Sequence, residues 1–372
     1  MKKIKLNKII YSIIGLAIIL AAIFSYMMYH KDIDDLNYHN GSAVSNQFLL
    51  GAYYYPWYNK DQWNNIKHTD TPQMGLYNSS DDEQIKRQVD EAQKANINFF
   101  LYSWAGVDTL SDKLLKTKLL YDLKNTNMNF AILYESYMSF QLPAGKPLDF
   151  DATNKNGDKV GDVFVKDMRY LAETYFSNKH YQKINNEPIV FIYLVRDFKN
   201  SDKYLTKANK YFKEKGIKVY LIADLVYWQA GNSMDWNMLG NNYSAITGYN
   251  MYGDDRNSNG YLQDVDSKYN EFQSAANKVG LHFVPNVQPG YDDRNLRGAK
   301  RPFIKRDDGD FYKKYWDIDL KYIDKSAPIM LLTSFNEWHE GTEIEPSNEY
   351  NNKYIELTRE LVEQTKQRFE FQ

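Results

Sequence analysis

The sequence predicts an α/β fold, a (β/α)8 TIM barrel preceded by one N-terminal transmembrane helix. Three observations lead to this prediction. Short apolar or aromatic runs alternate with amphipathic stretches along the chain, which is the pattern of repeated parallel βαβ units. No G-x-G-x-x-G follows the first run, which argues against a dinucleotide-binding open sheet. Polar and aromatic residues also follow every run, and barrel proteins gather their function at the carboxyl ends of the strands.

The expected strands are short runs dominated by apolar, β-branched and aromatic residues, as buried parallel strands require. Eight such runs follow one another in the sequence: Phe48–Tyr55, Ile97–Trp104, Asn129–Tyr134, Pro188–Leu194, Lys218–Leu225, Ala245–Asn250, His282–Val287 and Pro328–Ser334.

The expected helices lie between these runs and repeat apolar residues at spacings of three and four. In the first of them Ile85, Val89 and Ala92 form one stripe, which is typical of a helix with one buried face. The set comprises Asp82–Ala95, Asp112–Asn125, Asp162–Asn178, Ser201–Lys215, a shorter segment near Ser233–Leu239, Tyr261–Val279, Asp308–Ile323 and Glu349–Phe369.

The N-terminus is separate from the predicted barrel. Four lysines precede an uncharged run from Ile9 to Met28, which as a helix spans roughly 30 Å, the thickness of a bilayer core. We therefore expect residues 1–30 to be a cytoplasmic tip and signal anchor, 31–46 a tether, and 47–372 the catalytic barrel outside the cell membrane. A cleavable signal peptide, which would give a secreted protein, is the alternative.

Composition excludes several classes of function. The net charge of -2 offers no broad basic field for nucleic acid. The absence of cysteine excludes disulfides, zinc–thiolate sites and a cysteine nucleophile. Only 6 histidines occur, without a recognisable ligand spacing, so we expect neither a metal nor a cofactor. Aromatic residues reach 16%, which fits a carbohydrate partner because sugar faces stack on aromatic rings, and it also fits an aromatic-rich core. The oligomeric state stays open.

The strongest functional signal follows the eighth expected strand. The apolar run Ile329–Leu332 leads into Asn336, Glu337, His339 and Glu340, with Glu343 and Glu345 close behind. Carboxylates are costly to bury, so a chain gathers them at a strand end mainly where chemistry uses them. An ordinary solvated acidic loop is the alternative, but the interleaved Phe335 and Trp338 are poor choices for an open loop.

Two carboxylates three residues apart, beside an amide and aromatic walls, fit cleavage of a glycosidic bond. One carboxyl must be held protonated as a general acid while its neighbour is ionised. Like charges held close together push their pKa values apart, and Glu337 beside Glu340 supplies that arrangement. No G-x-S-x-G elbow occurs in the sequence, which argues against a serine hydrolase.

The motif Ser334-Phe-Asn-Glu-Trp-His-Glu-Gly-Thr-x-Ile-Glu345 resembles the signature of glycoside hydrolase family 99, the endo-α-mannosidase and endo-α-mannanase family, which includes bacterial surface-polysaccharide relatives. Further segments are similar in the same order along the chain, so the resemblance extends from residue 48 to about 365. These segments are Tyr53-Tyr-Tyr-Pro-Trp-Tyr58, Gly75-Leu-Tyr-Asn-Ser-Ser-Asp-Asp82 with Ser103-Trp104, and Pro289-Gly-Tyr-Asp-Asp-Arg294.

The resemblance implies a retaining, endo-acting hydrolase of an α-linked, mannose-type polysaccharide or oligosaccharide. Glu337 would take the proton of the substrate's 2-hydroxyl so that a 1,2-anhydro sugar forms, and Glu340 would be the general acid/base. A non-catalytic carbohydrate-binding or assembly protein, or a transglycosylase, is the alternative. The expected substrate-binding residues come from the resemblance or from strand-end position, and they are Tyr54, Trp57, Trp104, Glu135, Tyr249, Tyr252, Asn286, Tyr291, Asn336 and His339.

Overall fold

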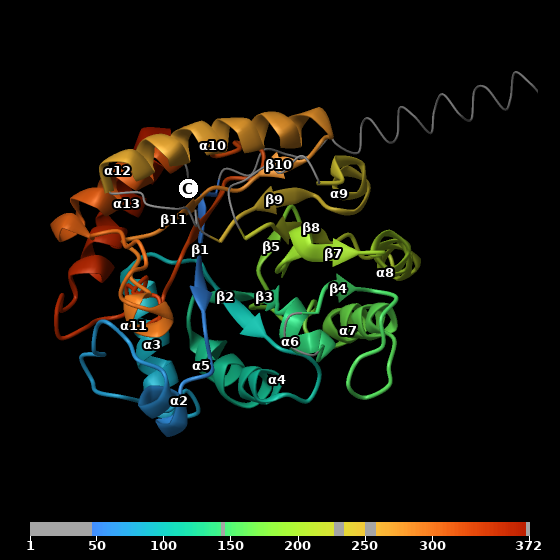
Figure 1. Ribbon diagram of the computed structural model, residues 1–372, viewed down its shortest axis with the longest axis horizontal. Helices are drawn as coiled ribbons and strands as arrows, with labels where there is room; N and C mark the ends of the chain where they lie inside the picture. Colours follow the sequence, from blue (N-terminus) through green and yellow to red (C-terminus); the bar gives the residue numbers. More distant parts are fainter. Residues whose placement is uncertain (1–46, 143–145, 227–233, 250–257, 370–372) are drawn as a thin grey trace, which may run out of the picture. The chain divides into compact units, whose positions relative to one another are not determined.

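The computed structural model describes residues 47–142, 146–226, 234–249 and 258–369 (Figure 1). The apolar run Ile9–Met28 lies outside these ranges, so the expected signal anchor and tether stay predictions. Within the ranges, no helix combines the length and the apolar composition that a membrane crossing requires.

The centre of the fold is a parallel sheet whose strands agree with the predicted runs. Its order is β10-β9-β8-β6-β3-β2-β1-β12-β11. The strands of this order in the described chain are β1 (Leu49–Tyr54), β2 (Phe99–Trp104), β3 (Asn129–Tyr134), β6 (Glu187–Ile192), β8 (Tyr220–Asp224), β9 (Ala245–Thr247), β10 (His282–Phe283), β11 (Asn286–Val287) and β12 (Ile329–Leu332). Short strands lie outside this order: β5 (Lys183–Ile184) runs antiparallel to β6, and β4 (Leu148–Asp149) pairs with β7 (Phe198–Lys199).

The first and last strands of this order, β10 and β11, follow each other directly in the sequence. β10 pairs with β9 and β11 pairs with β12, and only Val284 and Pro285 separate β10 from β11. Together they form the seventh predicted strand, His282–Val287, which is interrupted because Pro285 has no N–H for a ladder hydrogen bond. The carbonyl of Pro285 still accepts the Leu331 N–H at 2.9 Å. This connection gives the sheet a TIM-barrel-like form, as the sequence predicts.

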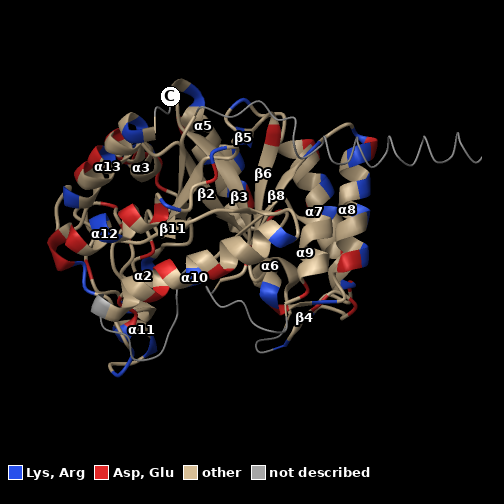
Figure 2. Cartoon of the chain, turned by 90° about the horizontal axis from the view of Figure 1, so that it is seen from above, with Lys and Arg blue, Asp and Glu red and all other residues tan. Residues whose placement is uncertain are grey.

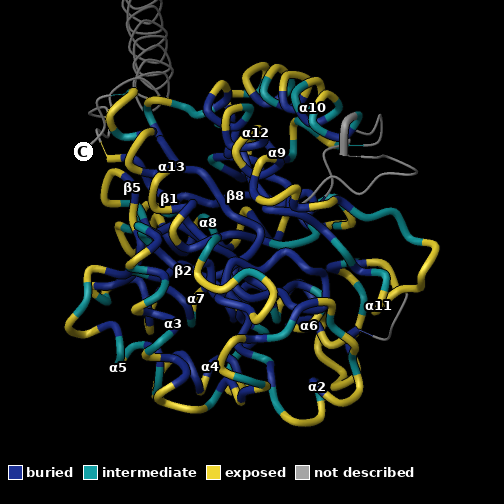
Figure 3. Tube along the Cα trace, turned by 90° about the vertical axis from the view of Figure 1, so that its left-hand side faces the viewer, coloured by how far each residue is buried: buried dark blue, intermediate teal, exposed yellow. Residues whose placement is uncertain are grey.

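Helices surround the sheet, and their polar faces carry most of the charges, while the strands are almost free of charged residues (Figures 1 and 2). Figure 3 shows the same division, with buried strands at the centre and exposed helix faces outside. The longer helices that follow the strands are α3 (Asp82–Lys94), α7 (Val160–Thr174), α8 (Asp202–Glu214), α9 (Trp236–Asn242), α10 (Ser258–Lys278), α12 (Asp310–Asp319) and α13 (Lys353–Phe369).

Strand alternation divides the buried residues into two layers. In β1, Leu49 and Tyr53 belong to the inner cluster, whereas Leu50 and Tyr54 belong to the cluster shared with the helices. Gly51 faces inward, and a Cβ at this position would come within 2.2 Å of the Phe99 ring, so only glycine leaves room for that ring. The residue at position 51 is therefore decided by its neighbour on the adjacent strand β2.

The structure differs from the prediction in the segments between the strands. The expected helix Asp112–Asn125 is broken into α4 (Leu110–Leu114), a π-helical turn, α5 (Leu120–Asp122) and a final 3-10 turn. Three short helices that the apolar pattern did not indicate lie in the loops: α2 (Lys60–Asn65), α6 (Ser136–Phe140) and α11 (Arg294–Arg297). They are too short to show an apolar stripe, because a stripe needs two or more turns.

Candidate active site

The loop after β12 is fixed to β1 by an amide side chain. Asn336 Oδ1 accepts the Tyr55 N–H at 2.8 Å, and its Nδ2 donates to the Tyr55 carbonyl at 3.0 Å. The amide thus pairs with the backbone as a neighbouring strand would. The backbone adds a hydrogen bond from Phe335 N–H to the Tyr53 carbonyl at 2.8 Å. Asn336 therefore positions the loop, and its amide is already engaged by the protein.

Two further acids of the motif also hold the loop. Glu345 accepts hydrogen bonds from Gln84 and Gln88 at 2.9 and 2.8 Å, and from Tyr77 and Trp338 at 2.8 and 3.0 Å. Glu343 lies 2.5 Å from the buried guanidinium of Arg306, which also donates to the Glu343 carbonyl. Four donors satisfy the Glu345 carboxylate, and Arg306 pairs with Glu343, whose Oε2 is buried without a hydrogen-bond partner among the described residues. Both acids are held by side chains of the protein, so we regard them as structural residues.

The two remaining acids, Glu337 and Glu340, lie on this loop in different surroundings. Glu337 is 4% exposed, and its Oε1 accepts the His339 N–H at 3.1 Å and lies 3.3 Å from His339 Nδ1. Its own N–H donates to Ser334 Oγ at 2.8 Å. Glu337 is thus held by groups of its own loop.

Glu340 is held by groups from other parts of the barrel. The Tyr249 hydroxyl donates to its Oε2 at 2.9 Å, and Arg297 Nη1 lies 2.8 Å from its Oε1. Burial raises the pKa of Glu340 to about 7, the Glu337 carboxylate adds to this rise, and Arg297 and Tyr249 oppose it. A carboxyl with this pKa can both donate and accept a proton near neutral pH, which is the property of a general acid/base.

A second group of buried acids, Glu135 and Asp224, lies at the carboxyl ends of β3 and β8. The Ser103 hydroxyl donates to Glu135 at 2.7 Å, and the Tyr53 hydroxyl donates to Asp224 at 2.7 Å. Burial raises the pKa of Glu135 to about 7 despite the Ser103 hydrogen bond, with smaller contributions from Asp224 and Glu337. Burial likewise raises the pKa of Asp224 to about 6.

Aromatic rings and unpaired polar atoms complete the site. Tyr55 and Trp57 stack with ring centroids 4.4 Å apart, and Tyr58 lies 5.2 Å from the His339 ring. Within the described ranges, Trp57 Nε1 and His339 Nε2 are buried and have no hydrogen-bond partner. Buried donors and acceptors are normally paired, so these two atoms are available to a polar ligand.

Two of the predicted binding residues point away from the inside of the barrel. Tyr54 donates its hydroxyl to Gln88 of α3 at 2.8 Å, and Trp104 donates its indole N–H to Asp112 at 2.9 Å. Both side chains belong to the layer between strands and helices. The expectation that they line the cleft is therefore corrected. Successive strand residues point to opposite faces, so their inward neighbours Tyr53 and Ser103 occupy the site instead.

The other predicted residues are distributed around Glu340. Asn286 donates its amide to the carbonyls of Gly248 and Tyr249 at 2.9 and 2.8 Å, so it positions Tyr249 and its donor atom is already engaged by backbone. The Tyr291 hydroxyl donates to Asp293 at 3.1 Å. Tyr252 lies outside the described residues.

Several residues of the site were not predicted. Strand alternation, applied strictly, could have identified Tyr53 and Ser103. Asp293 lies in the quoted segment Pro289–Arg294 but was not assigned a role, and no local signal marks Arg297, which reaches the site from the short helix α11. The described ranges contain no group of three or more histidine or acidic side chains able to hold a metal ion.

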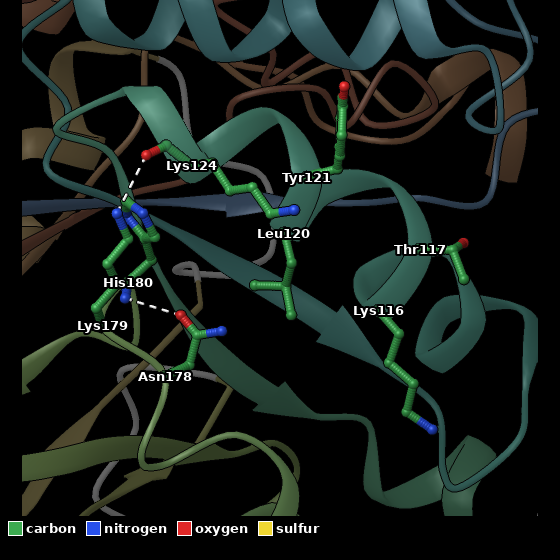
Figure 4. A pocket seen from close by; sticks show the side chains of 8 residues that line it. All are labelled: Lys116, Thr117, Leu120, Tyr121, Lys124, Asn178, Lys179 and His180. Atoms are coloured by element: carbon green, nitrogen blue, oxygen red, sulfur yellow. Dashed lines mark hydrogen bonds between the residues drawn. The ribbon is translucent and has the colours of Figure 1, made fainter.

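A hollow of about 400 Å³ lies near the start of β3, at the end of the strands opposite to the acidic pair (Figure 4). Lys124 belongs to the turn before β3, and His180 bonds to the Met128 carbonyl beside the first residue of that strand. The residues that line it are Lys116, Thr117, Leu120, Tyr121, Lys124, Asn178, Lys179 and His180. None of these is acidic, so the hollow lacks the carboxyl pair that distinguishes the carboxyl-end site.

Comparisons with known proteins extend over most of the chain. The sequence model of a protein family described as "Glycosyltransferase WbsX" matches residues 56–358. Glycoprotein endo-alpha-1,2-mannosidase of Mus musculus is 23% identical over 362 residues, which cover 83% of this chain and 71% of the mouse protein. A glycoprotein endo-alpha-1,2-mannosidase-like protein of Homo sapiens is 25% identical over 328 residues, covering 78% of this chain and 63% of the human protein.

Solved structures have a similar fold. The GH99 endo-alpha-mannosidase of Bacteroides thetaiotaomicron superimposes with a TM-score of 0.64 at 17% identity, covering 87% of this chain and 99% of that one. A structure described as a glycoside hydrolase-like protein superimposes with a TM-score of 0.70 at 19% identity, covering 86% and 95%. Together with the curated relatives, these matches confirm the resemblance to glycoside hydrolase family 99.

Proposed function

Because the chain belongs to the family described as glycosyltransferase WbsX and resembles glycoside hydrolase family 99, we propose that it is a retaining, endo-acting glycoside hydrolase of an α-linked, mannose-type glycan. The observation that carries the proposal is the pairing of Glu337 and Glu340 on one buried loop at the barrel mouth. Their contacts differ, since Glu340 is held by Tyr249 and Arg297 and Glu337 by His339. Two acids in unequal surroundings can take the two roles that glycoside cleavage requires.

The first step breaks the glycosidic bond. Glu337 takes the proton of the 2-hydroxyl, and the freed oxygen forms a bond to the anomeric carbon. The bond from that carbon to the leaving oxygen breaks, and Glu340 donates its proton to the leaving oxygen. This assignment of roles follows the family resemblance, and the pKa of about 7 that burial gives Glu340 suits the acid.

The second step opens the 1,2-anhydro sugar. Glu340, now ionised, takes a proton from water, and the water oxygen bonds to the anomeric carbon. The bond between that carbon and the 2-oxygen breaks, and Glu337 returns its proton to the 2-oxygen. Two successive inversions restore the original anomeric configuration, so the reaction retains it.

The proposal is tested with the purified chain, α-mannan and polysaccharide from the organism's own cell envelope. We expect the wild-type protein to release oligosaccharides from one polymer and Glu340→Gln to release none. Glu360→Gln, which changes an exposed residue of α13, is the matched control. Cleavage by Glu340→Gln at the wild-type rate would contradict the assignment. Tight binding by wild type without any product would instead favour a non-catalytic carbohydrate-binding protein.

A transglycosylase is the second candidate function, and the word glycosyltransferase in the description of the matching family favours it. The same two carboxyls serve, with an acceptor hydroxyl in place of water in the second step. Incubation with an added oligosaccharide acceptor separates the two. Products that carry the acceptor indicate transfer, whereas free reducing ends alone indicate hydrolysis.

We further propose that residues 1–30 anchor the chain in the cell membrane with the barrel on the outer side. The support is the basic N-terminus before the apolar run Ile9–Met28. A carbonate wash and protease treatment of intact cells test this. An anchored chain stays with the membrane and its barrel is digested, whereas release into the medium indicates signal cleavage.

A further inference from the structure

The contact between Arg297 and Glu340 is unexpected for a general acid. An arginine 2.8 Å from a carboxyl favours the ionised form, yet the first step requires the protonated form. The two residues come from separate loops, since Arg297 ends α11 and Glu340 follows β12. The contact therefore exists only because the fold places one loop over the other.

The backbone holds these two loops together. The Asp292 N–H donates to the Glu340 carbonyl at 2.7 Å. Gly341 has a φ of 59°, and a Cβ there would lie 3.2–3.3 Å from atoms of Asp292. Glycine at 341 thus permits this close approach in a left-handed conformation. The position of Arg297 relative to Glu340 is consequently set by the backbone.

Arg297 has a second carboxylate partner in Asp293. Its Nη1 lies 2.9 Å from Asp293 Oδ2, and it donates to the Tyr291 hydroxyl at 3.1 Å. Asp293 is completely buried and also pairs with Arg301 at 3.1 Å. One guanidinium is therefore shared between a buried, fixed carboxylate and the carboxyl that would exchange protons.

We propose that Arg297 is a positioning residue for Glu340: its shared ion pair with Asp293 fixes the orientation of the Glu340 carboxyl and limits how strongly the arginine favours the ionised form. The inference rests on the proposed function. When Glu340 is protonated, Asp293 remains as the counter-ion of Arg297. When Glu340 becomes ionised for the second step, Arg297 stabilises it. The same contact thus serves both halves of the reaction.

Among the residues that the structure describes, the other groups that face Glu340 are Glu337 from its own loop and Tyr249 from the segment after β9. Neither is changed by substitutions in α11. Arg294, in the same helix, pairs with Asp292 at 2.6 Å and stacks on Phe303, so it provides a matched control that leaves the Glu340 contact in place.

The test is a titration of Glu340 by infrared spectroscopy of the full chain labelled with 13C-glutamate, with Glu340→Gln used to assign its band. We expect Arg297→Gln to move the midpoint upward by about one pH unit or more, because a neighbouring positive charge is lost. Arg297→Lys should keep part of the effect. Asp293→Asn should move the midpoint downward, because Arg297 then acts on Glu340 alone. Arg294→Gln should leave it unchanged.

Opposite shifts of the Glu340 midpoint in Arg297→Gln and Asp293→Asn distinguish this role from general structural damage. Structural damage gives no reason for the two variants to shift the midpoint in opposite directions. When Asp293→Asn is combined with Arg297→Gln, it should shift the Glu340 midpoint much less than it does alone, because Arg297 transmits its effect. The alkaline limb of kcat/KM should move in the same directions as the titration. An unchanged midpoint in Arg297→Gln, or shifts of the same sign in Arg297→Gln and Asp293→Asn, would overturn the inference.

The readout separates this inference from the proposed function. If wild type cleaves glycan but Arg297→Gln titrates like wild type, the role of Arg297 is wrong and the hydrolase assignment stands. If the midpoints move as expected but wild type cleaves and transfers no glycan, the charge coupling stands and the catalytic role of Glu340 is wrong.

Discussion

The Tyr249 hydroxyl donates a hydrogen bond of 2.9 Å to Glu340 Oε2, although 91 positions separate the two residues in the sequence. Tyr249 follows β9 and Glu340 follows β12, and Asn286 after β10 holds the Tyr249 carbonyl at 2.8 Å. Residues at the ends of consecutive barrel strands thus place the Tyr249 hydroxyl against the Glu340 carboxyl.

Removing the Tyr249 hydroxyl should impair the reaction without unfolding the protein. The hydrogen bond lowers the pKa of Glu340, so in Tyr249→Phe this pKa should rise above its value of about 7. We expect kcat/KM to fall about 10- to 100-fold, the range for losing a hydrogen bond to a charged group. The alkaline limb of the pH profile should move to higher pH, and a limb that stays in place would contradict the role of Tyr249.

The 2-hydroxyl of the substrate is essential to the proposed first step. A substrate with a 2-deoxy sugar at the cleaved position should therefore resist the wild-type protein, and Glu337→Gln should be inactive on the normal substrate. Product formation is measured by chromatography of reducing ends. Normal cleavage of the 2-deoxy substrate would exclude the anhydro-sugar route while leaving Glu340 as acid/base.

Buried acids at the barrel mouth should make stability depend on pH. In the folded state burial raises the pKa of Glu135 to about 7, above an unfolded value of about 4.3. The folded state therefore binds this proton more tightly. The resulting stabilisation is complete below pH of about 4 and is lost as pH rises through about 7. Glu135→Gln should remove this pH-dependent part of the stability. The Tm of the wild type relative to that of the variant should therefore fall between pH 5 and pH 8.

The alternation of β1 predicts opposite outcomes for two adjacent tyrosines. Tyr53→Phe removes the donor to the buried Asp224 and should lower both activity and stability, the latter by about 1–3 kcal/mol. Tyr54→Phe removes a hydrogen bond to Gln88 behind the barrel and should leave kcat and KM unchanged. Assays of both variants with one glycan decide this. Equal losses of activity would mean that Tyr54 also reaches the cleft.

Asn286 should be required for the fold of the site rather than for binding. In Asn286→Asp, a carboxylate oxygen would face the carbonyls of Gly248 and Tyr249 where the amide now donates. We expect a loss of about 2–4 kcal/mol in the free energy of unfolding, measured by urea denaturation. Asn270→Asp on the exposed face of α10 is the control. A stable Asn286→Asp variant that only raises KM would favour direct substrate contact instead.

The sequence predicted the elements whose signal is local. Each barrel strand agrees with an apolar run, and Glu337 and Glu340 were identified because acids interleaved with Phe335 and Trp338 are unusual after a buried strand. The direction of Tyr54 and Trp104 was predicted wrongly, although the two-residue period of a strand contains that information. The helix Asp112–Asn125 was predicted, but its interruption was not, because the apolar stripe of Leu115, Leu119 and Leu123 continues across the π-helical turn.

By itself the sequence determined the order of strands and helices, the barrel fold and the acidic pair after the eighth strand. These follow from periodicity and from the cost of burying charge, which act over a few neighbouring residues. Only the tertiary structure decided which acids are structural and which carboxyl is held for proton exchange. Glu345 and Glu340 are both buried motif glutamates, and they differ because Gln84 and Gln88 reach one while Tyr249 and Arg297 reach the other. Such partners come from elements that are distant in the sequence, among them α3 and α11, and folding alone brings them within hydrogen-bond distance.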